Sequence, residues 1–153
     1  MMHAGAGRHA PACAAAVSLA AGLIGFPGRA IASPPPGDPA AGERVYVRCI
    51  GCHSPERHRT GPRHCGLVGR VSGTAAGYDY SPAMREAAIT WNAETLDAFL
   101  QAPLAAVPGT TMGFAGIADR GERRDLIRYL ETLTSASRQC RSATAAGEGE
   151  NLK

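Results

Sequence analysis

The residues best suited to chemistry lie between Arg48 and Pro55, where the chain reads Arg-Cys-Ile-Gly-Cys-His-Ser-Pro. Two cysteines stand three positions apart, and a histidine follows the second cysteine directly. Thiols at this spacing can bind a zinc ion, form a redox-active dithiol, or attach a haem through two thioether bonds. The adjacent histidine favours the haem, because its imidazole then comes under the porphyrin and can bind the iron.

The two other interpretations of this motif find less support in the rest of the sequence. A zinc site needs a second pair of ligands, but there is no other Cys-x-x-Cys, and Cys65 and Cys140 are far apart in the chain. A thioredoxin-like dithiol needs alternating strands and helices, and no such pattern is visible. We therefore predict one haem c, held by Cys49 and Cys52, with His53 as an axial ligand of its iron.

The first 32 residues resemble a secretory signal peptide. They contain no acidic residue, an alanine-rich apolar run extends from Ala12 to Phe26, and Ala30-Ile31-Ala32 has the form of a cleavage site. The run is too short for a permanent membrane anchor. A disordered alanine-rich leader is a weaker alternative. A lipoprotein anchor at Cys13 is also weaker, since the residues before Cys13 lack the leucine of an anchoring signal. We predict cleavage after about Ala32 and a periplasmic protein without stable membrane insertion.

The net charge of the exported chain excludes one large class of function. Removal of residues 1–32 takes away two arginines and leaves 14 basic against 13 acidic residues. A general nucleic-acid-binding protein would carry a strong basic excess. We therefore expect no nucleic-acid partner.

The elements that must position the motif are expected to be helices joined by long loops. Capping residues and apolar spacing predict a helix from Pro39, a short one over 82–88, one over 93–101, and a last one from Asp119 to about Thr134. Residues 54–77 predict a long loop, and the segment from Pro103 to Ile117 is expected to be irregular. The predicted divisions are a linker at 33–37, a domain at 38–134 and a polar, disordered tail at 135–153.

A second axial ligand has to come from a distant part of the chain. The candidates are two histidines, His58 and His64, and two methionines, Met84 and Met112. Met84 lies in the short helix, where packing is the simpler interpretation. Met112 lies in a segment between Pro108 and Gly113 that can bring the backbone close to a flat ring. Met112 is therefore the favoured ligand, and a thioether opposite a histidine raises the reduction potential.

With these motifs in place, the chain resembles a class I cytochrome c of the mitochondrial and photosynthetic-bacterial type. The resemblance covers about residues 38–133. It implies an all-α cytochrome c fold, with about four to five short helices and long loops wrapped around one covalently bound haem. The stretches that carry it include Thr60-Gly61-Pro62, Gly66-Leu67-Val68-Gly69-Arg70, Gly77-Tyr78-Asp79-Tyr80, Ile89-Thr90-Trp91 and Val107-Pro108-Gly109-Thr110-Thr111-Met112.

This resemblance also implies roles for individual residues. His53 and Met112 would bind the iron, and the carbonyl of Pro62 would accept the other N–H of His53. The remaining cofactor-binding residues would be three side chains on the propionate side and two in the methionine segment: Arg70, Tyr80, Trp91, Thr110 and Phe114.

The sequence departs from the family pattern at several positions. The mitochondrial form surrounds the exposed haem edge with lysines, and here those positions hold Leu104, Ala105, Thr111, Ala118 and Asp119. Phe99 replaces a tyrosine whose hydroxyl would reach the methionine sulfur. His64 replaces a leucine, and it either turns outward or lies near the haem and makes the potential pH-dependent. Cys65 and Cys140 are candidates for a disulfide.

The predicted function is one-electron, outer-sphere transfer by a monomeric carrier. Its partners would be a redox donor and a redox acceptor, as membrane-bound complexes that dock transiently. The alternative is the haem subunit of an oxidoreductase complex, or a peroxidase-like enzyme in which Met112 is labile. A ligand-binding sensor would also need an output domain, for which the chain has no room.

Overall fold

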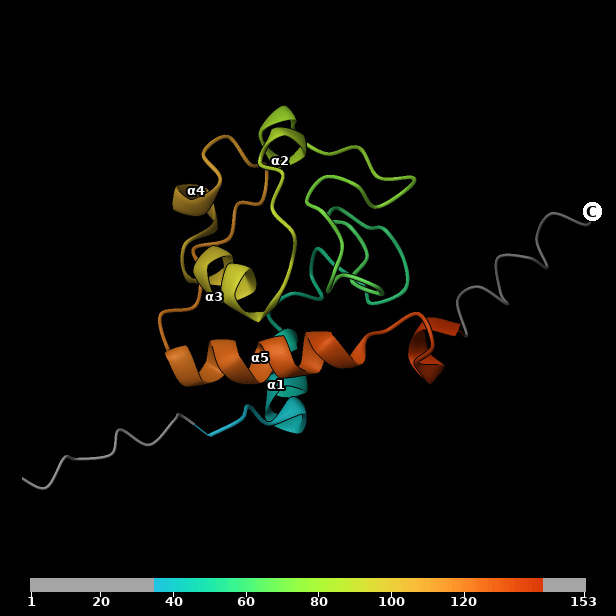
Figure 1. Cartoon of the computed structure of the whole chain (residues 1–153), viewed down its shortest axis with the longest axis vertical. Helices are drawn as coiled ribbons and strands as arrows, with labels where there is room; N and C mark the ends of the chain where they lie inside the picture. Colours follow the sequence, from blue (N-terminus) through green and yellow to red (C-terminus); the bar gives the residue numbers. More distant parts are fainter. Residues whose placement is uncertain (1–34, 142–153) are drawn as a thin grey trace, which may run out of the picture. The chain divides into compact units, whose positions relative to one another are not determined.

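The computed structural model describes residues 35–141. The predicted signal peptide, the start of the predicted linker and the predicted tail beyond residue 141 lie outside this range. The described part contains short helices and long loops (Figure 1). The helices are α1 (Pro39–Tyr46), α2 (Pro82–Glu86), α3 (Ala93–Gln101), α4 (Pro103–Ala106) and α5 (Arg120–Thr132). An isolated antiparallel bridge joins Val71, in the predicted loop, to Thr90, which lies between α2 and α3.

Side-chain caps begin the three longer helices at the predicted residues. The carboxylate of Asp38 accepts the N–H of Ala40, and Pro39 occupies the first position of α1. The amide of Asn92 and the hydroxyl of Thr95 cap each other's backbone at the start of α3. At α5, Asp119 accepts the N–H of Glu122 at 2.7 Å. These local bonds satisfy N–H groups that a helix start otherwise leaves without partners.

Two sequence-based expectations need correction in the middle of the chain. Irregular structure was expected at residues 103–106, but they form the short helix α4. Pro103 does not prevent this helix, because a proline is well tolerated in the first turn. The helix α2 ends at Glu86 rather than continuing to residue 88. Ala88 has a positive φ of 50°, which a right-handed helix cannot contain.

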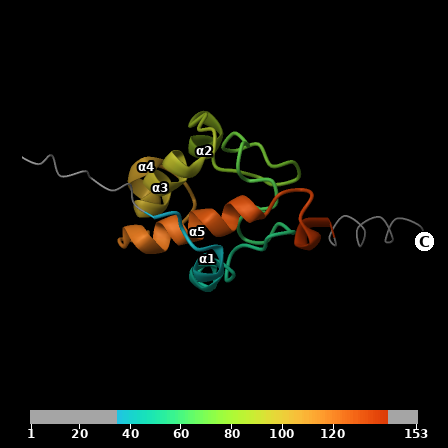
Figure 2. The ribbon, with the colours of Figure 1, turned by 60° about the horizontal axis from the view of Figure 1, so that its bottom comes forward.

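The first and last helices cross each other closely, as Figure 1 and Figure 2 both show. The contact requires a glycine, since a Cβ at Gly42 would lie 2.0 Å from the carbonyl oxygen of Asp125 and 2.8 Å from the Cβ of Tyr129. Next to this contact, the rings of Tyr46 and Tyr129 pack with their centroids 5.1 Å apart. The crossing fixes the end of α1, from which the cysteine motif continues.

A buried arginine joins α3, α5 and the segment before α5. The side chain of Arg123 is 5% exposed and donates to the carboxylate of Asp97 at 2.8 Å. It also donates to the backbone carbonyls of Ile117 at 2.8 Å and Ala118 at 2.9 Å. These charge-assisted bonds satisfy the buried guanidinium. They also fix the downstream end of the segment that carries Met112.

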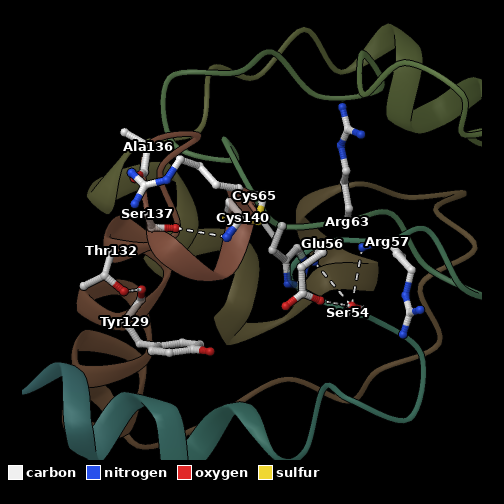
Figure 3. Close-up of a disulfide and its surroundings, with 12 residues drawn as sticks. Ser54, Glu56, Arg57, Arg63, Cys65, Tyr129, Thr132, Ala136, Ser137 and Cys140 are labelled. Carbon is white, nitrogen blue, oxygen red and sulfur yellow. Dashed lines mark hydrogen bonds between the residues drawn. A yellow bond between two sulfur atoms is a disulfide. The ribbon is translucent and has the colours of Figure 1, made fainter. Parts of the chain in front are cut away.

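A disulfide joins Cys65 in the long loop to Cys140, which follows α5 (Figure 3). The two Cα atoms are 5.7 Å apart, so the bridge suggested by the sequence is geometrically satisfied. Residues 135–141 form a turn and one helical turn, and the side chain of Cys140 is buried. Where the sequence predicted disordered chain from residue 135 onward, the bridge instead holds residues 135–141 against the domain.

Across residues 35–141, every helix is too short or too polar to span a bilayer.

Candidate functional site

The cysteine motif forms a helix-like turn directly after α1. The N–H of Cys52 donates to the carbonyl of Cys49 at 3.0 Å, and the N–H of His53 donates to the same carbonyl at 2.8 Å. The second bond has α-helical spacing, so Cys49 and His53 lie on the same side of the turn. Both cysteines are free thiols; Cys49 is half-buried and Cys52 is exposed.

Backbone contacts on two sides define the orientation of the His53 imidazole. Its Nδ1–H donates to the carbonyl oxygen of Pro62 at 2.7 Å. Gly61 lies against the ring, where an added Cβ would come within 2.3 Å of Cε1. Because Nδ1 carries the proton, Nε2 holds a free lone pair. Burial lowers the pKa of His53, opposed in part by the bond to Pro62, and this favours the neutral form that a metal ligand must have.

The two thiols of the motif differ in their surroundings. Burial raises the pKa of the Cys49 thiol to about 11, while the guanidinium of Arg48 opposes this shift. Cys49 therefore remains a protonated thiol near neutral pH. A zinc site would instead need thiolates, and the residues described include no group of three or more potential metal-binding His, Cys, Asp or Glu side chains.

The motif opens onto a cavity of about 350 Å³. All ten predicted site residues line it, although they are spread over positions 49 to 114 of the sequence. The leucines of α3 and α5 that the apolar spacing placed inside also line it, together with several residues that were not predicted there. The unpredicted lining residues include Leu67, Tyr78, Ser81 and Met84. Phe99 and His64, at positions that the resemblance places near the methionine sulfur and the haem, line the cavity as well.

Met112 reaches the cavity from a segment held at both ends. The N–H of Thr110 donates to the carbonyl of Val107 at 3.0 Å, and the N–H of Met112 donates to the hydroxyl of Thr110 at 3.3 Å. Downstream, the N–H of Ile117 donates to the carbonyl of Leu100 at 2.9 Å. These bonds fix the position of the half-buried Met112 side chain in the cavity wall without any regular helix or strand around it.

A second thioether also lines the cavity. Met84, in α2, is 8% exposed and belongs to the buried core. The sequence placed it in packing, and the structure shows both packing and a position in the cavity wall. The place of Met84 in a helix predicted a packing role. Nothing in the local sequence indicated that α2 would cover this cavity.

One wall of the cavity carries a half-buried positive charge, that of Arg70. The guanidinium of Arg70 donates to the carbonyls of Arg63 at 3.0 Å and Cys65 at 3.2 Å. Its Nε–H is buried and has no hydrogen-bond partner in the described structure. Tyr80 and Trp91 line the same cavity. An unsatisfied donor next to aromatic side chains suits a ligand that is largely apolar and carries an acidic group.

His64 is turned inward rather than toward solvent. Its imidazole lines the cavity and lies stacked on the ring of His53. Burial lowers the pKa of His64 well below its ordinary value, and the neighbouring His53 and Arg70 lower it further.

The residue types around the cavity fit a haem. Two thiols and an imidazole lie on one continuous turn, a thioether lies on a separate segment, the lining is mainly apolar, and Arg70 supplies an unpaired donor for a carboxylate. Neither a zinc site nor a redox-active dithiol would use all of these groups together.

Comparisons with known proteins agree with this chemistry. The chain matches no family model. It is 47% identical over 108 residues to the cytochrome c of Chlamydomonas reinhardtii, an alignment that covers 68% of this chain and 96% of that protein. It is 44% identical over 105 residues to the cytochrome c of Ginkgo biloba, covering 66% of this chain and 93% of that protein.

A solved structure shows the same fold. Cytochrome cH from Methylobacterium extorquens superposes with a TM-score of 0.62 at 41% sequence identity. The superposition covers 63% of this chain and 99% of that structure. The part of this chain that folds around the cavity therefore corresponds to a complete domain of known architecture.

Proposed function

This chain belongs to the cytochrome c family, with the all-α fold of class I members, and on that basis we propose that it is a periplasmic electron carrier that uses one covalently attached haem c. Cytochromes c transfer electrons through haem. The observation that carries the proposal is the gathering of all ten predicted site residues around a single cavity. A stability requirement alone would not place two free thiols, an imidazole and a thioether in one apolar wall.

Each of these side chains has a defined task in the proposal. Cys49 and Cys52 would each add an S–H across a vinyl group, forming a carbon–sulfur bond and transferring the proton to the neighbouring carbon. His53 would bind the iron through Nε2, since Nδ1–H is committed to Pro62. Met112 would bind it through the thioether sulfur. Arg70, Tyr80 and Trp91 would face the propionates, and the unpaired Nε–H of Arg70 would find its acceptor there.

The bound iron would supply reversible one-electron chemistry. The protein contributes a site that changes little between the two oxidation states. The hydroxyl of Thr110 accepts the N–H of Met112, and the carbonyl of Pro62 accepts Nδ1–H of His53. These bonds hold the two ligand-bearing segments, and the apolar lining limits the entry of water. If His53 and Met112 both bind the iron, no open position would remain for a substrate, which favours a carrier over an enzyme. Its donor and acceptor would be membrane-bound redox complexes that dock transiently.

Covalent attachment is the first experimental test of this proposal. The full chain, expressed with its export signal and a haem-attachment system, is expected to give sharp low-spin absorption bands in both oxidation states and to retain haem colour on a denaturing gel. The double variant Cys49→Ser/Cys52→Ser is expected to lose that colour. The matched control, Cys65→Ser/Cys140→Ser, is expected to keep it. Loss in both variants, or retention in both, would contradict the assignment.

Carbon monoxide distinguishes the carrier from the peroxidase-like alternative. The reduced carrier at neutral pH is expected to bind the gas slowly or not at all, because Met112 occupies the sixth position. Rapid binding would mean a labile Met112 and an open site, and would support the enzyme instead.

A further inference from the structure

The ring of His64 is held against the ring of His53. The two imidazole centroids are 4.3 Å apart and the ring planes are inclined by 22°, a stacked arrangement. Nothing in the local sequence requires this contact, since the two residues are eleven positions apart. It arises because the loop after the cysteine motif turns back and presents His64 to the buried face of that motif.

A hydrogen bond from the crossing of α1 and α5 fixes the orientation of His64. Its Nδ1 lies 2.9 Å from the hydroxyl oxygen of Tyr46 and is hydrogen-bonded to it. Tyr46 is itself only 3% exposed, and it packs on Tyr129 of α5. The ring of His64 is therefore bonded to one of the most constrained side chains of the domain.

The backbone that carries His64 is fixed on both sides. The guanidinium of Arg70 donates to the carbonyls of the residues immediately before and after it, Arg63 and Cys65. The N–H of Cys65 donates to the carbonyl of Pro55 at 2.7 Å, and its sulfur is bonded to Cys140 (Figure 3). His64 thus has little freedom to move away from His53.

These contacts supply a constraint that the bond to Pro62 cannot. The hydrogen bond at Nδ1 fixes one point of the His53 ring and Gly61 restricts it near Cε1, but the ring plane can still rock within these two limits. A second ring stacked on its face removes that freedom, as supporting contacts commonly do for metal ligands.

We infer that His64 is a positioning residue that sets the plane of the His53 imidazole through their stacking contact, and that Tyr46 and the Cys65–Cys140 disulfide hold it in place. The inference rests on the proposed function, in which Nε2 of His53 binds the haem iron. It assigns a role to a position at which the family pattern has a leucine, which could fill the space but could not stack as a flat ring.

The test is electron paramagnetic resonance of the ferric full-length protein, because the g values of low-spin haem depend on the plane of the axial imidazole. His64→Leu removes the flat ring, and we expect shifted g values and a broadened signal. His64→Phe keeps a flat ring without the nitrogen atoms, and we expect it to return the signal toward that of the wild type. The matched control is His58→Leu, which removes a half-buried histidine of the same loop. His58 does not line the cavity, and it bonds to the carbonyl of Ala76 and accepts the N–H of Arg63.

A milder variant covers the case in which His64→Leu does not fold. Tyr46→Phe keeps both stacked rings and removes only the hydrogen bond, and we expect a smaller broadening in the same direction. Wild-type g values in His64→Leu, or equal changes in His64→Leu and His58→Leu, would overturn the positioning role. Wild-type g values in Tyr46→Phe would overturn the part of the inference in which Tyr46 holds His64 in place.

The same spectra separate this inference from the proposed function. A wild-type protein without a low-spin ferric signal would contradict the proposed ligands themselves. A low-spin wild-type protein whose g values are unmoved by His64→Leu would contradict only the role of His64.

Discussion

Pro62 decides which nitrogen of His53 is available to a metal. Its carbonyl accepts Nδ1–H at 2.7 Å, so the free lone pair is on Nε2. The resemblance of Thr60-Gly61-Pro62 to the family pattern predicted this contact from sequence. The stacking of His64 on His53 could not be predicted in the same way, because it depends on the path of the whole loop between them.

Phe99 offers a test of how the cavity wall tunes the iron. It lines the cavity and packs on Trp91 with ring centroids 5.0 Å apart. In Phe99→Tyr the new hydroxyl is expected to donate to the sulfur of Met112 and weaken it as an electron donor. Ferric iron then loses more stabilisation than ferrous iron. A hydrogen bond of about 1 kcal/mol corresponds to a rise of roughly 40 mV in the reduction potential.

Redox titration of the wild type and Phe99→Tyr under the same conditions checks this prediction. The absorption bands should stay low-spin, which shows that the ligands are unchanged. A potential that is equal or lower in the variant would contradict the proposed interaction with Met112.

Helix starts were the most predictable elements, because they depend on residues within one turn. Asp38, Asn92 and Asp119 each cap the expected helix with a side-chain oxygen. Two features were missed, one for a long-range reason and one for a local reason. Met84 lines the cavity only because α2 is placed over it, and α4 is a single turn that has no side-chain cap to announce it.

The crossing of α1 and α5 depends on the absence of a side chain at Gly42. Alanine in a helix is favoured over glycine by about 1 kcal/mol when nothing opposes it. Here the added Cβ would lie 2.0 Å from a backbone oxygen of α5, so the helices must move apart. We expect Gly42→Ala to lower the free energy of unfolding by roughly 2 kcal/mol, in the range of overpacked cores.

Guanidinium unfolding followed by circular dichroism measures this effect. Gly51→Ala is the matched control, because a Cβ there meets no atom within 4 Å, and its stability is expected to stay within about 0.5 kcal/mol of the wild type. A Gly42→Ala protein as stable as this control would mean that the helices adapt without loss.

At the scale of the whole molecule, the disulfide connects parts of the chain that are 75 residues apart. It joins the loop that carries Pro62 and His64 to the segment after α5. The sequence suggested the pairing of Cys65 with Cys140 but could not establish that their Cα atoms are close. The structure brings them to 5.7 Å because the loop folds back over the end of α5.

Removing the disulfide should destabilise the protein through its unfolded state. In the chain-entropy model, closing a loop of this length lowers the entropy of the unfolded chain and so raises the free energy of unfolding by about 4 kcal/mol. We expect Cys65→Ser/Cys140→Ser to lose about this amount in guanidinium unfolding, and the wild type to lose the same amount when reduced. A wild-type protein whose stability is unaffected by reductant would contradict the bridge.

Positive charge near the cavity is reduced at two positions. Arg48, beside the first thiol, is bonded to Glu122 at both guanidinium ends, at 2.8 and 2.6 Å. Leu104, at a position where the family has lysine, is 55% exposed. Attraction between this surface and an acidic partner should therefore be weak, and the rate of association should depend little on salt.

Stopped-flow oxidation by ferricyanide tests this expectation. Raising the ionic strength from about 0.01 M to about 0.1 M shortens the screening length from about 30 Å to about 10 Å. We expect the rate of the wild type to change by less than about two-fold over this range. The variant Leu104→Lys/Ala105→Lys/Ala118→Lys restores positive charge, and its rate should fall steeply with salt. Equal, steep slopes for both proteins would contradict a weakly charged surface.

The central claim is that iron is held between His53 and the sulfur of Met112, and one comparison tests it most directly. Two thioethers line the cavity, so Met84 provides an internal control. The account predicts that the ferric wild type and Met84→Ala both show the weak near-infrared band of thioether-bound Fe(III), and that Met112→Ala lacks it. A band that persists in Met112→Ala, or that disappears only in Met84→Ala, would contradict the account.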